Sequence, residues 1–249
     1  MKRKIEILTS NETAQLFEKE LFEETDVVRQ KSEFFANASH ELKTPITVMR
    51  GLAELLLQED NLNEKERKQL ERIHKESVRM TNLVSDMLKI SKLERGEETD
   101  ERAVVEWKEI AEEVVAEFFE EIRAKNLKVK IKGAGKIAID PKKAFELLQN
   151  LCGNAVHYNK ENGWLEIVFE EDETHTTVSV KDGGIGIEEE HLPRLCERFY
   201  RVDKSRSKKT GGTGLGLSIV KHICVLYGAS LTIESEFGEG TEVTVRFQK

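Results

Sequence analysis

The sequence of 249 residues predicts a multidomain chain in which an all-α helical hairpin is followed by an α+β sandwich. Three observations support this prediction. Apolar residues recur at steps of three and four up to about residue 90, a short polar run around Gly96 breaks that rhythm, and the rest of the chain mixes short β-type runs with helical ones. With 38% hydrophobic residues, a chain of this length can bury a core in each of two modest domains.

The first half is predicted to form two long helices. A polar stretch over residues 58–65 separates two heptad patterns, and Thr9 and Glu12 have capping-box spacing at the start of the first. Each helix exposes an apolar stripe that one partner helix cannot cover, so we expect two hairpins to pair as a homodimeric four-helix bundle. A monomeric bundle closed by helices of the second half is the alternative. The heptad positions are Phe17, Leu21, Val28, Phe35, Ala38, Leu42, Met49, Leu52 and Leu56, then Leu70, Ile73, Ser77, Met80, Val84, Met87 and Ser91.

The second half is predicted to be a mixed sheet with helices on one face, because several strands follow one another without an intervening helix. Strands are expected at 127–131, 165–169, 177–180, 230–233 and 242–247, and helices at 107–124, 141–157 and 215–227.

Composition excludes several classes of function. The net charge is -8 and the chain has no long basic run, so we expect no nucleic acid partner. Its three cysteines are far apart and indicate neither a zinc site nor disulfides, which fits the cytoplasm. Since no apolar run approaches the roughly 20 residues of a membrane span, membrane attachment is expected only through a sensor region absent from this chain.

One histidine of the first predicted helix has unusual neighbours. His40 is two residues from Ala38 in the heptad seam, which turns it toward solvent. A carboxylate at Glu41 can accept the Nδ1 proton and leave Nε2 as a nucleophile, while Thr44, one turn further, can orient a water molecule. Pro45 removes a helical hydrogen bond and favours a kink.

The segment from Ser39 to Pro45 closely resembles the H-box of the commonest class of sensor histidine kinases, Ser-His-Glu-Leu followed by Arg or Lys and Thr-Pro. The resemblance implies that His40 is phosphorylated, that Glu41 is its acid/base partner, and that Thr44 serves in dephosphorylation of a response regulator. It therefore implies a response regulator receiver domain as partner and a bifunctional kinase and phosphatase.

Candidate nucleotide-binding residues occur without a P-loop and without the signatures of Ser/Thr/Tyr protein kinases. On the predicted helix 141–157, Asn150 and Asn154 lie one turn apart, where amide oxygens can hold Mg²⁺. A helix cap or solvated surface explains them about equally well. The run Asp182-Gly183-Gly184-Ile185-Gly186 follows a strand and lets a carboxylate meet an adenine amine, although a tight turn also explains its glycines.

Two further segments complete the candidate site. Phe199 to Arg201 lead into the polar stretch 202–210, which we interpret as a lid that brings basic groups near phosphates. Residues 211–217, Gly-Gly-Thr-Gly-Leu-Gly-Leu, then open a helix whose free amides can face a triphosphate. The basic candidates are Arg201, Lys204, Lys208 and Lys209.

In this order, the segments resemble the N, G1, F and G2 boxes of the Bergerat-type ATP-binding fold shared by histidine kinases, DNA gyrase B and MutL. The resemblance implies ATP and Mg²⁺ as cofactors. By this match Asn154, with Asn150, coordinates Mg²⁺, Asp182 binds adenine, and Phe199 stabilises the lid. The other matching positions, implied to shape the pocket or wrap the phosphates, are His157, Tyr158, Gly184, Gly186, Arg201, Lys208, Thr213, Gly214, Leu215 and Gly216.

Two positions depart from the family pattern. Gly183 stands where Asn is usual after the G1 aspartate, and His157 stands where many members have Lys, which makes its contact with phosphate dependent on pH.

The resemblance covers about residues 31–249 and divides the chain into four parts. Residues 1–30 are expected to form a linker or signalling helix, 31–95 the dimerisation and histidine-phosphotransfer domain, 96–100 a linker, and 101–249 the catalytic ATP-binding domain. Two rival functions are a catalytically silent dimeric scaffold and a true ATPase. The second lacks the glutamate base that such ATPases carry at the position of Asn150.

Overall fold

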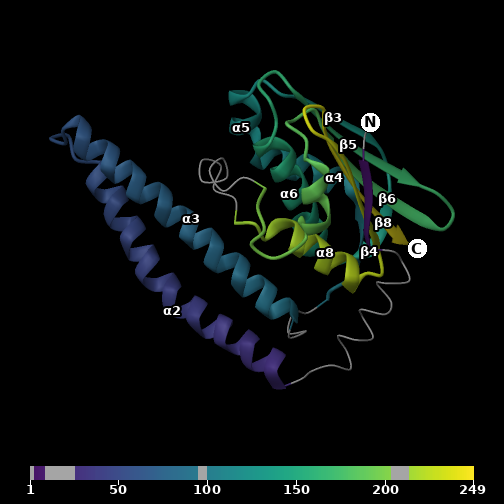
Figure 1. Cartoon of the computed structure of the whole chain (residues 1–249), viewed down its shortest axis with the longest axis horizontal. Helices are drawn as coiled ribbons and strands as arrows, with labels where there is room; N and C mark the ends of the chain where they lie inside the picture. The colour runs from purple at the N-terminus through teal and green to yellow at the C-terminus, as the bar shows by residue number, and fades with distance from the viewer. Residues whose placement is uncertain (1–2, 9–25, 95–99, 203–212) are drawn as a thin grey trace. The chain divides into compact units, whose positions relative to one another are not determined.

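The computed structural model describes residues 3–8, 26–94, 100–202 and 213–249, without the side chains of 26–37, 40, 89–90 and 92–94. The chain divides into two compact units (Figure 1). The helical unit contains the described residues 26–94 and 213–215, and the sheet unit contains 3–8, 100–202 and 216–249.

The helical unit confirms the predicted hairpin. Helix α2 covers Asp26–Leu57 and helix α3 covers Glu64–Glu94. A capping box begins α3, because the Asn63 side chain accepts from the Glu66 amide at 2.9 Å and the Glu66 carboxylate accepts from the Asn63 amide at 3.0 Å. The Arg67 guanidinium donates to the Leu57 carbonyl at the end of α2, 3.2 Å away. The expected helix start at Thr9 and Glu12 lies outside the described residues.

Residues seven apart form the seam between the two helices. Ser39, Ile46 and Ala53 are buried on α2, and Ser77 and Val84, together with Ser91, are buried on α3. Small side chains let the two helices approach closely.

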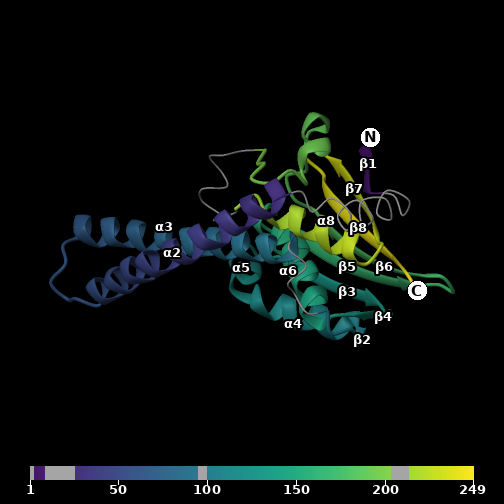
Figure 2. The ribbon, with the colours of Figure 1, turned by 90° about the horizontal axis from the view of Figure 1, so that it is seen from below.

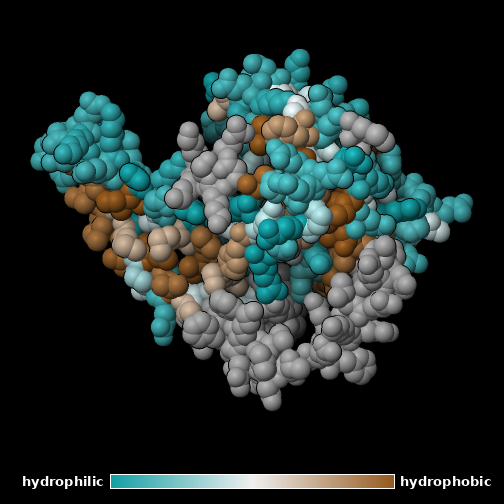
Figure 3. Space-filling model, in the orientation of Figure 1, coloured by the Kyte–Doolittle hydropathy of each residue, from teal (hydrophilic) through white to brown (hydrophobic). Residues whose placement is uncertain are grey.

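As expected from the heptad pattern, a single partner helix does not cover the whole apolar stripe of α2. Leu42, Met49 and Leu52 are each about half exposed in the single chain, as are Ile73 and Met80 on α3. Leu42 and Met49 lie three or four residues from the buried Ser39, Ile46 and Ala53, so they flank the contact with α3 and stay partly exposed. Figure 3 shows the resulting band of hydrophobic side chains along the hairpin.

The sheet unit confirms the predicted α+β architecture. Its six-stranded sheet has the order β1-β7-β8-β6-β5-β3, and only β3 and β5 pair in parallel. A separate antiparallel pair joins β2 to β4. The strands are β1 (Arg3–Leu8), β2 (Ala103–Glu106), β3 (Lys128–Gly133), β4 (Lys136–Ile139), β5 (Trp164–Glu171), β6 (His175–Asp182), β7 (Ser230–Glu236) and β8 (Gly240–Gln248).

Helices cover one face of this sheet (Figures 1 and 2). Alternate residues of the strands point into the core below them, where Trp107 stacks 6.2 Å from Phe169 and lies 5.6 Å from Phe247. The predicted helix 107–124 is divided at Phe118. The helices are α4 (Trp107–Glu117), α5 (Phe119–Ala124), α6 (Pro141–His157), the 3-10 helix η1 (Glu189–Arg194) and α8 (Gly216–Leu226).

Strand β1 was not anticipated. Residues 3–8 were assigned to the N-terminal linker, but they pair antiparallel with β7 at the edge of the sheet. Leu8 is only 2% exposed there.

Candidate functional site

Helix α6 carries the two candidate asparagines. The helix begins at Pro141, preceded by the Asp140 carboxylate, which accepts from the Lys142 amide at 2.8 Å. Asn150 and Asn154 follow on the same helix and are both half-buried. Local sequence signals thus place both amides in one helical frame, one turn apart.

The start of α8 lies against Asn150. The Asn150 Nδ2 atom donates to the Glu146 carbonyl at 2.8 Å. A Cβ on Gly216, the first residue of α8, would lie only 2.7 Å from Asn150 Oδ1. A larger residue at 216 would displace the Asn150 side chain, whose amide oxygen lies against the first turn of α8.

The turn after β6 packs against the other end of α6. Asp182 ends the strand, and its Oδ1 accepts from the Gly184 amide at 2.8 Å. The Ile185 amide donates to the Tyr158 carbonyl at 3.1 Å. A Cβ on Gly184 would lie 2.5 Å from that same carbonyl oxygen, so the turn needs glycine there. Tyr158 thus supports the Asp182 turn through its backbone carbonyl.

A second glycine fits the turn against the β7–β8 connection. Gly186 has φ +65°, and a Cβ there would overlap the Glu236 carbonyl. The Gly238 amide donates to the Ile185 carbonyl at 2.7 Å. Both glycines are therefore required by close backbone approach, and the Asp182 turn is held from two sides.

Trp164 explains the unusual Gly183, and the sequence reading missed it. A Cβ on Gly183 would overlap the indole ring of Trp164, whose carbonyl also accepts from the Gly183 amide at 3.1 Å. The indole ring of Trp164 occupies the space that a side chain at position 183 would need. The departure from the family pattern at Gly183 was visible in the sequence, but the sequence did not identify Trp164 as the residue that packs against it.

His157 is half-buried at the end of α6. Its ring meets Phe118 edge-on at 5.9 Å, and the Lys125 ammonium donates to the carbonyls of Val156 and His157, each at 2.7 Å. Burial lowers the pKa of His157, Lys125 adds to this, and the negative charge of Glu121 opposes it. The lowered pKa favours the neutral form of His157 at pH 7, and this form carries no positive charge toward phosphate.

This arrangement predicts a pH dependence of stability. The folded state holds the pKa of His157 below its unfolded value of about 6.5, so its neutral form stabilises the fold fully above that pH and the contribution is lost as pH falls further. We expect His157→Phe, which keeps a ring against Phe118, to lose less stability than the unchanged chain between pH 7.5 and 5.5. Urea unfolding at both pH values measures this, and equal losses would contradict it.

The residues that precede the predicted lid are held by side-chain contacts. The Tyr200 hydroxyl lies 2.7 Å from His191 Nδ1, and the Arg194 guanidinium stacks 4.2 Å above the Tyr200 ring while pairing with Glu197 at 2.9 Å. Phe199 is 48% exposed with φ +63°, and Arg201 is half-buried. Lys204, Lys208 and Lys209 lie outside the described residues.

Three residues before α8 belong to the glycine-rich segment. Gly214 has φ +77°, Leu215 is fully buried, and the Leu215 amide donates to the Thr213 hydroxyl at 3.3 Å. The prediction that this segment opens a helix is confirmed, because α8 begins at Gly216.

The candidate phosphoacceptor lies on α2. His40 is helical, with its side chain outside the described atoms, while Glu41, the next residue, and Thr44, one turn further along the helix, are exposed. The helix continues through Pro45, and the Thr47 hydroxyl donates to the Lys43 carbonyl at 2.8 Å.

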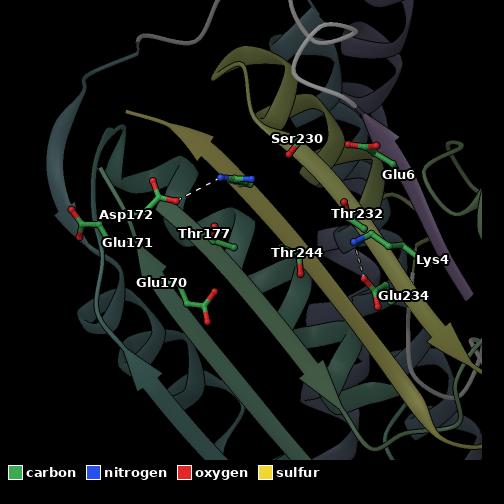
Figure 4. A pocket seen from close by; sticks show the side chains of 11 residues that line it. Lys4, Glu6, Glu170, Glu171, Asp172, Thr177, Ser230, Thr232, Glu234 and Thr244 are labelled. Carbon is green, nitrogen blue, oxygen red and sulfur yellow. Dashed lines mark ion pairs between the residues drawn. The ribbon is translucent and has the colours of Figure 1, made fainter. Parts of the chain in front are cut away.

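A shallow polar trough lies elsewhere, on the open face of the sheet (Figure 4). It contains none of the candidate nucleotide-binding residues. Its charged lining residues are Lys4, Glu6, Glu170, Glu171, Asp172, Glu234 and Arg246.

Among the helices that the structure describes, none is long and apolar enough to cross a membrane.

The fold and the site define a two-part protein: a helical hairpin with an H-box histidine and a Bergerat-type α+β unit. Family models match both parts, "His Kinase A (phospho-acceptor) domain" over residues 30–96 and "Histidine kinase-, DNA gyrase B-, and HSP90-like ATPase" over residues 139–249. The chain belongs to the sensor histidine kinases of two-component systems.

Similar proteins include other sensor kinases. The phosphate regulon sensor protein PhoR of Pseudomonas aeruginosa is 36% identical over 88% of this chain and 50% of its own length, and the sensor histidine kinase YkoH of Bacillus subtilis is 34% identical over 97% and 51%. This chain spans about half the length of these relatives. Among solved structures, the catalytic domain of histidine kinase ThkA is 27% identical, with a TM-score of 0.53 over 60% of this chain and 96% of that one.

Two structures of longer kinases share the fold. Full-length ShkA in complex with AMPPNP has a TM-score of 0.71 at 24% identity, over 86% of this chain and 45% of that one. ThkA in complex with the response regulator protein TrrA has a TM-score of 0.64 at 24% identity, over 94% and 67%.

Proposed function

We propose that this chain transfers the γ-phosphate of ATP to its own His40 and then to an aspartate of a response regulator. The observation that carries the proposal is the convergence on α6. The Asn150 amide oxygen meets the start of α8, and Tyr158 meets the turn that holds Asp182. An amide, a helix N-terminus and a carboxylate at a glycine turn are the groups that a metal, phosphates and adenine respectively require.

The donor set on α6 fits Mg²⁺. Amide oxygens are ligands of this hard cation, and Asn150 Oδ1 already faces the helix start that would bind phosphates. We propose Asn154 and Asn150 as its protein ligands. When bound, Mg²⁺ supplies neutralisation of the charge that develops on the transferred phosphoryl group.

An asparagine at position 150 also suits a kinase better than an ATPase. A neutral amide cannot take a proton from water, so Asn150 cannot act as the general base that activates water for hydrolysis of bound ATP. In the proposed step, His40 Nε2 forms a bond to the γ-phosphorus as the bond to the bridging oxygen breaks, and ADP leaves with that electron pair. Glu41 takes the Nδ1 proton, which leaves a neutral phosphoimidazole ring.

The partner is proposed to be a response regulator receiver domain, as in the ThkA complex with TrrA. Thr44, exposed one turn beyond His40, is proposed to orient the water that removes phosphate from the regulator. The half-exposed stripe of Leu42, Met49 and Leu52 supports a homodimer in which a second hairpin covers it. We propose a cytoplasmic site of action, with any membrane anchor in a sensor region outside this chain.

Incubation with γ-labelled ATP and Mg²⁺ tests this function. The kinase is expected to gain an acid-labile, base-stable label that approaches one phosphate per acceptor site. Continuous release of phosphate without label would instead indicate an ATPase. Binding of ATP without either product would indicate a silent scaffold.

A further inference from the structure

The outer edge of β7 is a strand-binding surface, and its occupant comes from the far end of the chain. Residues 3–8 precede the helical hairpin in sequence, yet they form β1 of the sheet unit. Ile5 pairs with Ile233 and Leu8 with Leu231. Without β1, β7 would be an open edge strand with unpaired backbone groups.

Side chains fix which segment binds this edge. Leu8 is 2% exposed, so its burial favours the docked strand. Lys4 Nζ pairs with Glu234 Oε1 at 3.0 Å on the trough side of the sheet (Figure 4), and Arg3 Nε pairs with Glu189 Oε2 on η1 at 3.2 Å. Exposed ion pairs add little stability, but they specify direction and register.

The connectivity gives this strand a mechanical consequence. The helical hairpin joins the sheet unit after α3, through residues 95–99, and β1 adds a second connection before α2, through residues 9–25. Both ends of the hairpin are then attached to the sheet unit. A second attachment reduces the number of orientations that the sheet unit can adopt relative to the hairpin.

We infer that β1 is a strap that slows autophosphorylation while it is paired with β7. The inference rests on the proposed function, in which ATP held on α6 must reach His40 on α2. Arg3 also connects the strap to η1, which precedes Tyr200 and the predicted lid. A change on the N-terminal side of α2 that withdraws residues 3–8 therefore frees the sheet unit without altering the ATP site.

A reversible crosslink tests the strap in the full chain. Lys4 and Glu234 are register partners, and the Cα separation of antiparallel partners suits a disulfide. In the Lys4→Cys, Glu234→Cys double variant, the oxidised form is expected to autophosphorylate at least about fivefold more slowly than the reduced form, with unchanged ATP affinity. Deletion of residues 2–8 is expected to accelerate the reaction by a similar factor.

A matched crosslink within the same sheet provides the control. Thr232 and Thr244 are register partners on β7 and β8, and neither belongs to β1. The Thr232→Cys, Thr244→Cys variant is expected to react equally fast when oxidised and reduced. Burial raises the pKa of Cys152 and Cys196 to about 12, and also raises that of Cys224, so the native thiols compete poorly.

The outcomes separate the strap from the function on which it rests. Equal rates for the oxidised and reduced Lys4→Cys, Glu234→Cys protein would overturn the strap, as would a crosslink between subunits on a non-reducing gel. Absence of label from every variant, including the unchanged chain, would overturn the kinase proposal instead. If the deletion variant unfolds, the comparison of the oxidised and reduced Lys4→Cys, Glu234→Cys protein still tests the strap.

Discussion

Replacing His40 by alanine is expected to lower the acid-labile phosphate on the protein by at least about a hundredfold, because this side chain supplies the attacking nitrogen. ATP affinity is expected to stay unchanged, since the groups proposed to hold ATP lie on α6, at the end of β6 and at the start of α8. Labelling with γ-labelled ATP and equilibrium binding of a fluorescent nucleotide measure the two quantities separately.

A second histidine of the helical unit serves as the control. His74 lies on α3, where its Nε2 is 3.0 Å from a Glu54 carboxylate oxygen. His74→Ala is expected to retain the label. Undiminished label in His40→Ala would exclude His40 as the acceptor and would leave the H-box without its proposed role.

Replacing Gly186 by alanine is expected to destabilise the sheet unit by about 3 kcal/mol or more. Two costs add. A left-handed backbone costs a non-glycine residue about 1–2 kcal/mol, and the new Cβ would overlap the Glu236 carbonyl, so the β7–β8 turn must move. Because this turn holds the Asp182 segment, ATP affinity is expected to fall as well. Urea unfolding and nucleotide binding measure both effects.

Gly228 separates the two costs. It has φ +61°, close to that of Gly186, but a Cβ there would meet nothing within 4 Å. Gly228→Ala is expected to cost only about 1 kcal/mol and to leave ATP affinity unchanged. Equal losses in the two variants would mean that backbone strain alone, without steric overlap, accounts for the requirement for glycine at 186.

Local signals in the sequence were enough for the main helices. Heptad spacing predicted α2 and α3, and Asp140-Pro141 predicted the start of α6. The glycine-rich run predicted a helix from residue 215, and α8 begins at Gly216. The pattern did not show which part of the apolar stripe faces which neighbour. On α2 the small residues Ser39 and Ala53 face α3, while Leu42 remains exposed.

The order of the candidate boxes was also visible in the sequence, but the reason for each glycine was not. The backbone of Tyr158 requires glycine at 184, the backbone of Glu236 requires it at 186, and the Asn150 side chain lies against Gly216. These partners lie from about 25 to 65 residues away along the chain, so only the packed structure shows which backbone or amide atoms approach each glycine.

By itself, the sequence determined the helical hairpin, the mixed sheet, the family and the candidate residues, because all of these depend on local spacing and residue type. The tertiary structure alone decided three features: the burial that lowers the pKa of His157, the match of Trp164 with Gly183, and the pairing of β1 with β7. Each depends on atoms far apart in the chain. Strand pairing in particular uses backbone groups that every residue except proline carries, so residues 3–8 show no sequence signature of their partner.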